Sequence, residues 1–171
     1  MRMCSIVACL LILSGCSVQS SQLAAVMDLI RKPASDVPLN GWLVKYAEYE
    51  NIVYPVNTSQ GTLFSNATGD QILFDGWSVR HISGFGLRGS AYYNSDIGSQ
   101  RTFVRRGQSL VVHQCDQWQQ KQRSGKKQFS QSCEGNKVYT NTILVEQDGS
   151  ISAIQQIVDD KYEPLILTRL N

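Results

Sequence analysis

Apolar and polar residues alternate along most of the chain after Pro38, with the period of two that is typical of β-strands with one buried face. Such segments, rich in β-branched and aromatic residues, cover residues 42–56, 71–74, 77–82, 102–104, 108–118, 137–145, 150–158 and 164–170. Asp75-Gly76 and Asp148-Gly149 each separate two of them, and Asp-Gly is typical of a two-residue hairpin turn. The polar residues 119–128 are interpreted as a loop. No stretch between the strands has the length and period of a crossover helix, so the pattern predicts a mostly β fold with an antiparallel sheet.

One short helix is predicted ahead of the strands, over residues 21–33. Its apolar residues follow the spacing of a single helix face: Leu23, Val26, Met27 and Ile30. Pro33 ends the helix, because proline cannot continue the backbone hydrogen bonding. We expect this amphipathic helix to pack on the domain rather than to lie on a membrane.

The first residues have the features of an export signal. Arg2 supplies a positive charge, and the apolar stretch at residues 6–13 is too short to span a bilayer as a stable helix. Leu13-Ser14-Gly15-Cys16 resembles the bacterial lipobox, in which the cysteine becomes the new N-terminus and carries the lipid. An ordinary signal peptide with an incidental thiol at Cys16 is the alternative. The predicted organisation is therefore a signal peptide at 1–15, a lipidated tether at 16–20 and a single β-rich domain at 21–171.

Cysteine usage agrees with an oxidising compartment. Two of the five cysteines leave with the signal peptide and Cys16 takes the lipid, so Cys115 and Cys133 remain as an even pair. Their separation suits a disulfide across the base of a hairpin. The two histidines, His81 and His113, lack the spacing of metal ligands, so neither a metal nor a cofactor is expected.

A glycine-rich stretch follows the segment at 77–82. Gly84, Gly86 and Gly89 form the pattern G-x-G-x-x-G, which in dinucleotide-binding proteins lies between a strand and a helix. Residues 90–98 here contain turn-forming residues and no helical period. We therefore interpret the glycines as backbone bends with left-handed φ, and expect no bound nucleotide.

Two stretches carry a resemblance to a known family. "GDQILFDGWSVRHISGFGL" looks like the central hairpin, and "YTNTILVEQDGSISAIQQIV" like the late hairpin, of the group 4 capsule polysaccharide lipoprotein family (YjbF/GfcB-like). The resemblance implies a mostly β fold of coiled sheets with a helix, and an accessory role in exopolysaccharide or capsule production and export. It brings no catalytic residues. Together with the residue pattern it predicts antiparallel coiled or barrel-like sheets with one N-terminal amphipathic helix.

Basic residues are concentrated in one part of the chain, although the net charge is only +2. Asp116 is the only acid between Arg101 and Lys127. A loop closed by the expected disulfide is a candidate site for an acidic polysaccharide or lipopolysaccharide, because cations attract anionic polymers and a tryptophan can stack on a sugar ring. Its candidate ligand-binding residues are Lys121, Arg123, Lys126, Lys127 and Trp118, together with Arg105 and Arg106. The alternative is a solvated hairpin tip.

Three functions remain open from the sequence. The first is a non-enzymatic outer-membrane lipoprotein that assists polysaccharide export. Such a protein would be held by its lipid anchor and would contact export proteins of the outer membrane. Ser17, in place of the aspartate that retains lipoproteins in the inner membrane, favours the outer membrane. The second is a structural or assembly subunit of another envelope machine. The third is a periplasmic enzyme, which the scattered carboxylates do not support. Nucleic acid is not an expected partner.

Overall fold

The computed structural model describes residues 40–87, 91–123 and 125–170. The predicted signal peptide, Cys16, the tether and the predicted helix at 21–33 lie outside these residues. The described part consists of strands and turns, and none of it forms a helix long and apolar enough to cross a membrane. The strands are β1 (Trp42–Tyr46), β2 (Tyr49–Thr58), β3 (Gly61–Ser65), β4 (Gln71–Phe74), β5 (Val79–Ser83), β6 (Tyr92–Ile97), β7 (Gln100–Arg105), β8 (Gln108–Cys115), β9 (Gln119–Arg123), β10 (Lys126–Glu134), β11 (Val138–Val145), β12 (Ile151–Ile157) and β13 (Pro164–Arg169).

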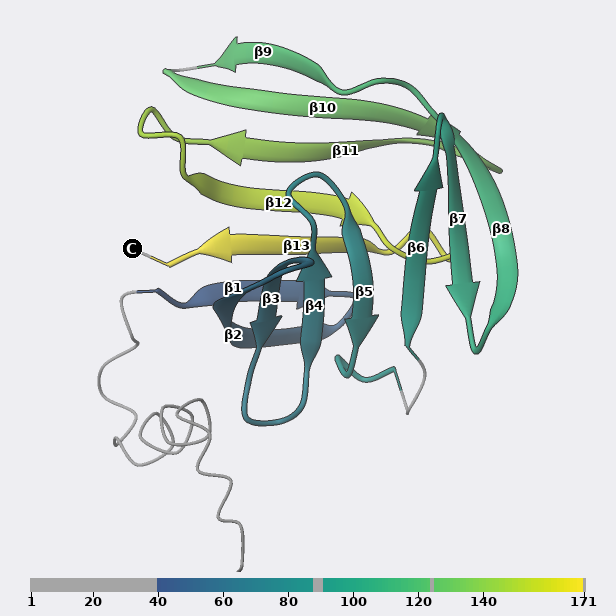
Figure 1. Ribbon diagram of the computed structural model, residues 1–171, viewed down its shortest axis with the longest axis horizontal. Coiled ribbons are helices and arrows are strands. Elements are labelled where there is room, and N and C mark those ends of the chain that lie inside the picture. The colour runs from purple at the N-terminus through teal and green to yellow at the C-terminus, as the bar shows by residue number, and fades with distance from the viewer. Residues whose placement is uncertain (1–39, 88–90, 124, 171) are drawn as a thin grey trace, which may run out of the picture. The chain divides into compact units, whose positions relative to one another are not determined.

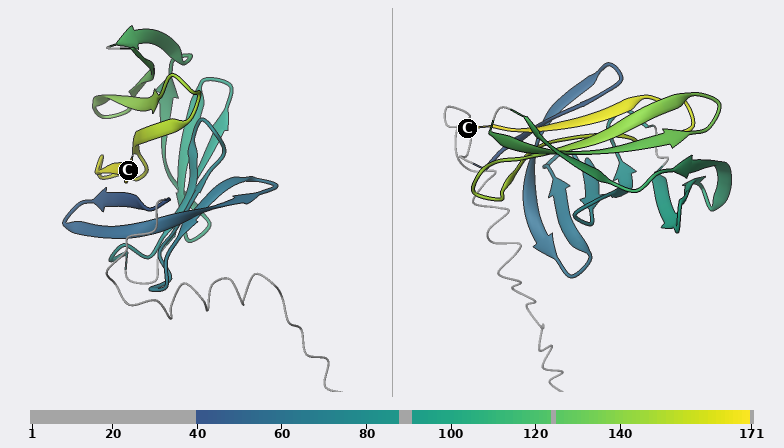
Figure 2. Two further views of the ribbon diagram at one scale, coloured as in Figure 1. Left: turned by 90° about the vertical axis from the view of Figure 1, so that its left-hand side faces the viewer. Right: turned by 90° about the horizontal axis from the view of Figure 1, so that it is seen from above.

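The sheet is antiparallel throughout and closes on itself, which confirms the predicted mostly β, barrel-like class. Its order is β11-β12-β13-β1-β2-β3-β4-β5-β6-β7-β8-β10, and β10 pairs back with β11 to complete a ring of 12 strands. β9 pairs with β10 beside this ring. In Figure 1, β10–β13 and β1 run across the view, whereas β4–β8 run up it. Figure 2 (left) shows β9 at one end of the row that continues through β10–β13 to β1 and β2.

The core lies between these two groups of strands. Val44, Ile143 and Leu167 come from one group, and Ile72 and Phe103 from the other; each is at most 2% exposed. Alternating residues of each strand point inward, as the sequence pattern predicts. Polar residues also lie in the interior, and the largest fully buried side chain is an arginine.

The strands differ from the prediction where the alternating pattern is weak. The predicted loop at 119–128 is wrong: these residues form β9 and the start of β10. Among the described residues β9 is an edge strand that pairs with β10 alone, and its sequence is QQKQR, so no alternation of apolar residues indicates it. β3 and β6 were also not expected, and the segment at 42–56 divides at Ala47 into β1 and β2.

Both predicted Asp-Gly hairpins form, but the predicted two-residue turns are wrong. Phe74 pairs with Val79 and Val145 pairs with Ile151, so four and five residues connect the strands, and each hairpin contains a register shift. The aspartate side chain organises each turn. Asp75 Oδ1 accepts hydrogen bonds from the N–H groups of Trp77 (2.9 Å) and Ser78 (2.7 Å).

The glycine run is a turn folded around a buried carboxylate. Gly84 has φ +82° and Gly86 has φ +73°, and a Cβ on Gly84 would lie 2.8 Å from Cα of Asp70. Phe85 N–H donates to Asp70 Oδ1 at 2.7 Å. The other carboxylate oxygen accepts from Tyr49, Asn51, Asn66 and Thr68. Burial alone would raise the pKa of Asp70, but these hydrogen bonds hold it below its ordinary value. The interpretation of Gly84 and Gly86 as bends is confirmed, whereas Gly89 lies outside the described residues; the next described element is the strand β6.

Candidate functional site

The disulfide lies where β8 meets β10. Cys115 and Cys133 are directly opposite in the ladder, with their Cα atoms 4.0 Å apart, and their sulfurs are bonded. The predicted pairing is thus present. Only Cys133–Cys115 and Glu134–Gln114 pair between these two strands, so the bond links a narrow seam of the closed sheet, matched among the described residues by the two pairs between β5 and β6. The first part of β10, residues 126–130, pairs with β9 instead of β8.

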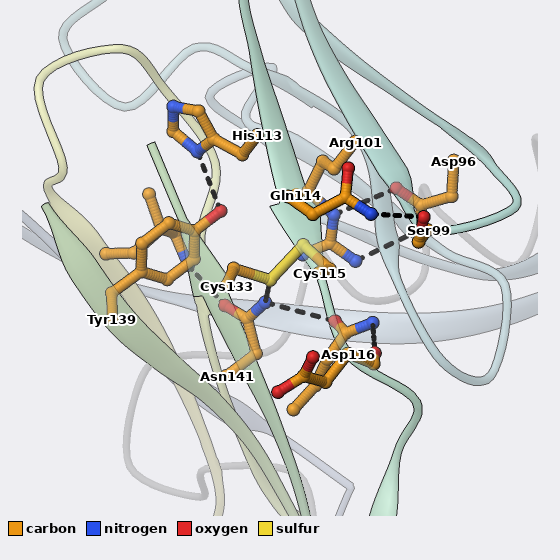
Figure 3. Close-up of a disulfide and its surroundings, with 12 residues drawn as sticks. Asp96, Ser99, Arg101, His113, Gln114, Cys115, Asp116, Cys133, Tyr139 and Asn141 are labelled. Carbon is orange, nitrogen blue, oxygen red and sulfur yellow. Dashed lines mark hydrogen bonds and ion pairs between the residues drawn. A yellow bond between two sulfur atoms is a disulfide. The ribbon is translucent and has the colours of Figure 1, made fainter. Parts of the chain in front are cut away.

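An ion pair lies next to this disulfide, and it joins a buried arginine to a partly exposed aspartate (Figure 3). Arg101 is 1% exposed; its Nε donates to Asp96 Oδ1 at 2.8 Å and its Nη2 donates to Ser78 Oγ at 2.7 Å. His113 lies opposite Arg101 in the ladder between β7 and β8. In the sequence Arg101 begins the part of the chain that is rich in basic residues. In the structure it is buried in the core, where it links β7 with β6 and with Ser78, the residue before β5.

The candidate basic residues 121–127 lie on one hairpin. Arg123 at the end of β9 pairs with Lys126 at the start of β10. We call residues 119–128 the basic hairpin. Lys126 Nζ contacts Glu146 Oε1 at 2.7 Å, and this hydrogen bond holds the pKa of Glu146 below its ordinary value.

The lysines of the basic hairpin are divided between its two faces. Directly opposite residues of an antiparallel pair share a face, and successive residues alternate. Lys121 lies opposite Gln128, which places it on the same face as Lys126. Lys127 is on the other face together with Phe129, which packs against the core. Lys127 is therefore the lysine that belongs to the inner side of the sheet.

An aromatic cluster lies on that inner side. The Trp77 ring is 5.7 Å from Trp118 and 5.3 Å from Phe129 between centroids. Trp118 and Phe129 are partly buried against the core, whereas Trp77 is 48% exposed. We call Trp77, Trp118 and Phe129 the aromatic platform. It joins the turn between β4 and β5 to the basic hairpin.

The turn that carries Trp77 is fixed across the interior. Buried Gln156 on β12 donates through Nε2 to the carbonyl of Trp77 at 2.7 Å and accepts through Oε1 from Val79 N–H at 2.9 Å. Two hydrogen bonds from one side chain thus hold the turn over β12. The backbone of the turn that carries Trp77 is therefore fixed relative to β12.

Arg105 and Arg106 are not part of this site, so the structure does not bring all the predicted basic residues together. They lie at the turn between β7 and β8, and Arg105 stacks on Tyr92, with its guanidinium carbon 5.1 Å from the ring centroid. The length of β8 alone separates them from the disulfide by about 20 Å, at roughly 3.3 Å per residue. The basic hairpin extends further in the same direction.

A cleft opens on the other side of the turn between β4 and β5. It has a volume of about 580 Å³. Trp42, Phe64 and Ile154 contribute to its apolar floor, and the Trp42 and Phe64 rings meet edge to face at 5.1 Å. Its rim is polar, with amide and hydroxyl side chains from Asn40, Asn57, Thr62 and Ser150. Amides, hydroxyls and an aromatic floor are groups that bind sugars or other polyhydroxylated ligands.

The histidines form no catalytic arrangement. His113 is 2% exposed, with Nδ1 2.9 Å from the Tyr139 hydroxyl and Nε2 3.3 Å from the Tyr162 hydroxyl. Burial and the charge of Arg101 lower the pKa of His113, so it is neutral near pH 7. His81 contacts Ser83. Within residues 40–87, 91–123 and 125–170, no carboxylate bonds to either histidine, and no group of three or more potential metal ligands forms.

Sequence reasoning missed Trp77, Phe129 and the cleft. Trp118 was predicted because it precedes the basic residues, whereas Trp77 approaches it only through the closure of the sheet.

No family model, curated protein or solved structure matches the chain. The resemblance to the capsule lipoprotein family therefore stays a prediction that depends on the two quoted hairpins.

Proposed function

We propose that this protein is a lipid-anchored outer-membrane protein that assists the production or export of an acidic exopolysaccharide or capsule, without catalysing a reaction. It binds the anionic glycan on the aromatic platform and the inner face of the basic hairpin. The observation that carries this proposal is that Lys127 shares a face of β10 with Phe129, two residues away, whose ring contacts Trp77. Aromatic rings stack on sugars, and an ammonium group attracts carboxylate or phosphate.

The proposed location is supported by the sequence around Cys16. A processed cysteine that carries several acyl chains anchors a protein firmly, because each buried methylene contributes about 0.8 kcal/mol. We expect acyl mass on an N-terminal Cys16 of the mature protein and loss of membrane association in Cys16→Ala. Unchanged membrane fractionation of this variant would contradict lipidation.

Replacing Lys127 with serine should weaken glycan binding about tenfold, the equivalent of about 1.4 kcal/mol. The reason is the loss of the one lysine that shares a face with the aromatic platform. Binding of polygalacturonate, hyaluronan and lipopolysaccharide to the full-length chain is measured by titration calorimetry at low and near-physiological salt. Screening should weaken binding as salt rises.

Lys121→Ser is the matched control. It removes the same charge from the same hairpin on the opposite face, and both lysines are exposed, so neither change should alter the free energy of unfolding by more than about 0.5 kcal/mol. Equal effects of the two substitutions would indicate non-specific attraction to the hairpin. If none of the three polymers binds, the proposed function is wrong.

The free edge of β9 favours the second candidate, an assembly subunit that binds a protein strand. The proposed interface is the outer edge of β9, where the N–H of Gln122 would pair with the partner strand. Gln122→Pro should then abolish binding of an extended partner segment while glycan binding persists. Co-purification of the same envelope proteins with this variant and with the wild type would exclude this edge as the interface.

A further inference from the structure

The aromatic platform and the cleft are connected by a continuous strip on the inner side of the sheet. Lys127 on β10 pairs with Val145 on β11, and Val145 pairs with Ile151 on β12. Val145 and Ile151 are partly buried and pack against the core, so part of each remains accessible. Ile151 also lines the cleft. The strip therefore leads from the basic hairpin, across the ends of β11 and β12, to the cleft.

The length of the strip follows from the strand order. β10 and β1 are separated by β11, β12 and β13, so the four steps between them correspond to about 19 Å at roughly 4.8 Å per strand. Lys127 is on the first of these strands and Trp42, in the cleft, is on the last. This distance exceeds the size of a single sugar or a single anionic group.

The two ends of the strip differ in their chemistry. The Lys127 end is cationic, and Phe129 of the aromatic platform lies two residues further along the same face of β10. The cleft end has amide and hydroxyl groups, and the acid in its lining, Asp75, is engaged by Arg80. The cleft lining also contains one cation, Arg169, whose Nη1 donates to Ser150 Oγ at 2.9 Å. Amides and hydroxyls both donate and accept hydrogen bonds, which matches the hydroxyl groups of a neutral sugar unit.

We propose that the strip and the cleft form one extended groove for a linear glycan that combines acidic and neutral sugar units. This inference rests on the proposed function and specifies its ligand. The acidic unit lies at Lys127 and the aromatic platform, the chain crosses Val145 and Ile151, and a neutral unit occupies the cleft at Asn57. A lipid headgroup or a free phosphate would use the cationic end alone.

The test compares short and long probes. Hyaluronan alternates acidic and neutral units, and a tetrasaccharide and a decasaccharide of it are titrated against the full-length chain. The decasaccharide should bind about tenfold more tightly, because it reaches the cleft. Asn57→Ala, at an exposed position of β2, should weaken decasaccharide binding about threefold to tenfold, as expected for the loss of one or two hydrogen bonds, and leave tetrasaccharide binding unchanged.

Asn136→Ala is the matched control, because Asn136 is an equally exposed asparagine in the turn after β10, away from the strip. It should change the binding of neither probe. Equal affinities for both probes, or no effect of Asn57→Ala on the decasaccharide, would overturn the extended groove while the proposed function stands. The same holds if lipopolysaccharide binds in a way that depends on Lys127 but not on Asn57. Failure of hyaluronan, polygalacturonate and lipopolysaccharide alike to bind would overturn both proposals.

Discussion

Replacing Asp96 with alanine should lower the free energy of unfolding by about 3–5 kcal/mol, the usual cost of leaving one partner of a buried ion pair uncompensated. Arg101 is 1% exposed and its Nε and Nη2 both contact this carboxylate. Ser78 Oγ, which also bonds to Asp96, would be left with Arg101 alone. Urea unfolding followed by tryptophan fluorescence measures the change.

A double variant separates the charge effect from the loss of packing. Replacing Asp96 and Arg101 together with leucine removes both charges and should cost less than Asp96→Ala, because no isolated charge remains buried. An Asp96→Ala protein within about 1 kcal/mol of the wild type would show that water reaches Arg101 and that this part of the core is hydrated.

The same ion pair determines part of the response to acid. Burial raises the pKa of Asp96, but the hydrogen bond and charge of Arg101 lower it by more, so the folded-state pKa is below the ordinary value of 3.8. The ion pair therefore stabilises the fold above about pH 3.8, and this contribution is lost as the pH falls through the lower folded-state pKa. Stability should fall more steeply with acid in the wild type than in Asp96→Ala.

Removing the disulfide should lower the free energy of unfolding by about 3 kcal/mol in the Cys115→Ser/Cys133→Ser variant, mainly because the unfolded chain regains the freedom of the closed loop. The two cysteines are 18 residues apart, and the seam they cross contains only two residue pairs. Hydrogen exchange should therefore increase first in β8 and β9, and later in β3 and β4.

Wild-type protein unfolded in the presence of a reductant is the control for the serine substitutions, and it should lose a similar amount of stability. An equal unfolding midpoint for oxidised and reduced protein would show that the hydrogen bonds of β9, β10 and β11 hold the seam without the covalent bond.

Residue patterns alone determined the features that depend on local chemistry. The alternation around Ile72, Ile143 and Ile154 predicted strands whose inward residues are buried, because the side-chain period of a strand is two. Cys115 and Cys133 were paired by elimination, since no other cysteine remained. Gly84 was interpreted as a bend without knowledge of Asp70, because glycine adopts a positive φ at little steric cost.

Only the tertiary structure decided the features that depend on partners far along the chain. β9 has no apolar alternation because it is an edge strand outside the ring, so its hydrogen bonds with β10 define it. Arg101 resembled its exposed basic neighbours in the sequence, and its burial follows from the carboxylate that β6 places opposite it. Trp77 and Trp118 meet because Gln156 holds one turn across the interior. Such contacts join segments that have no local signal for each other, so closure of the sheet, rather than any short motif, creates the candidate site.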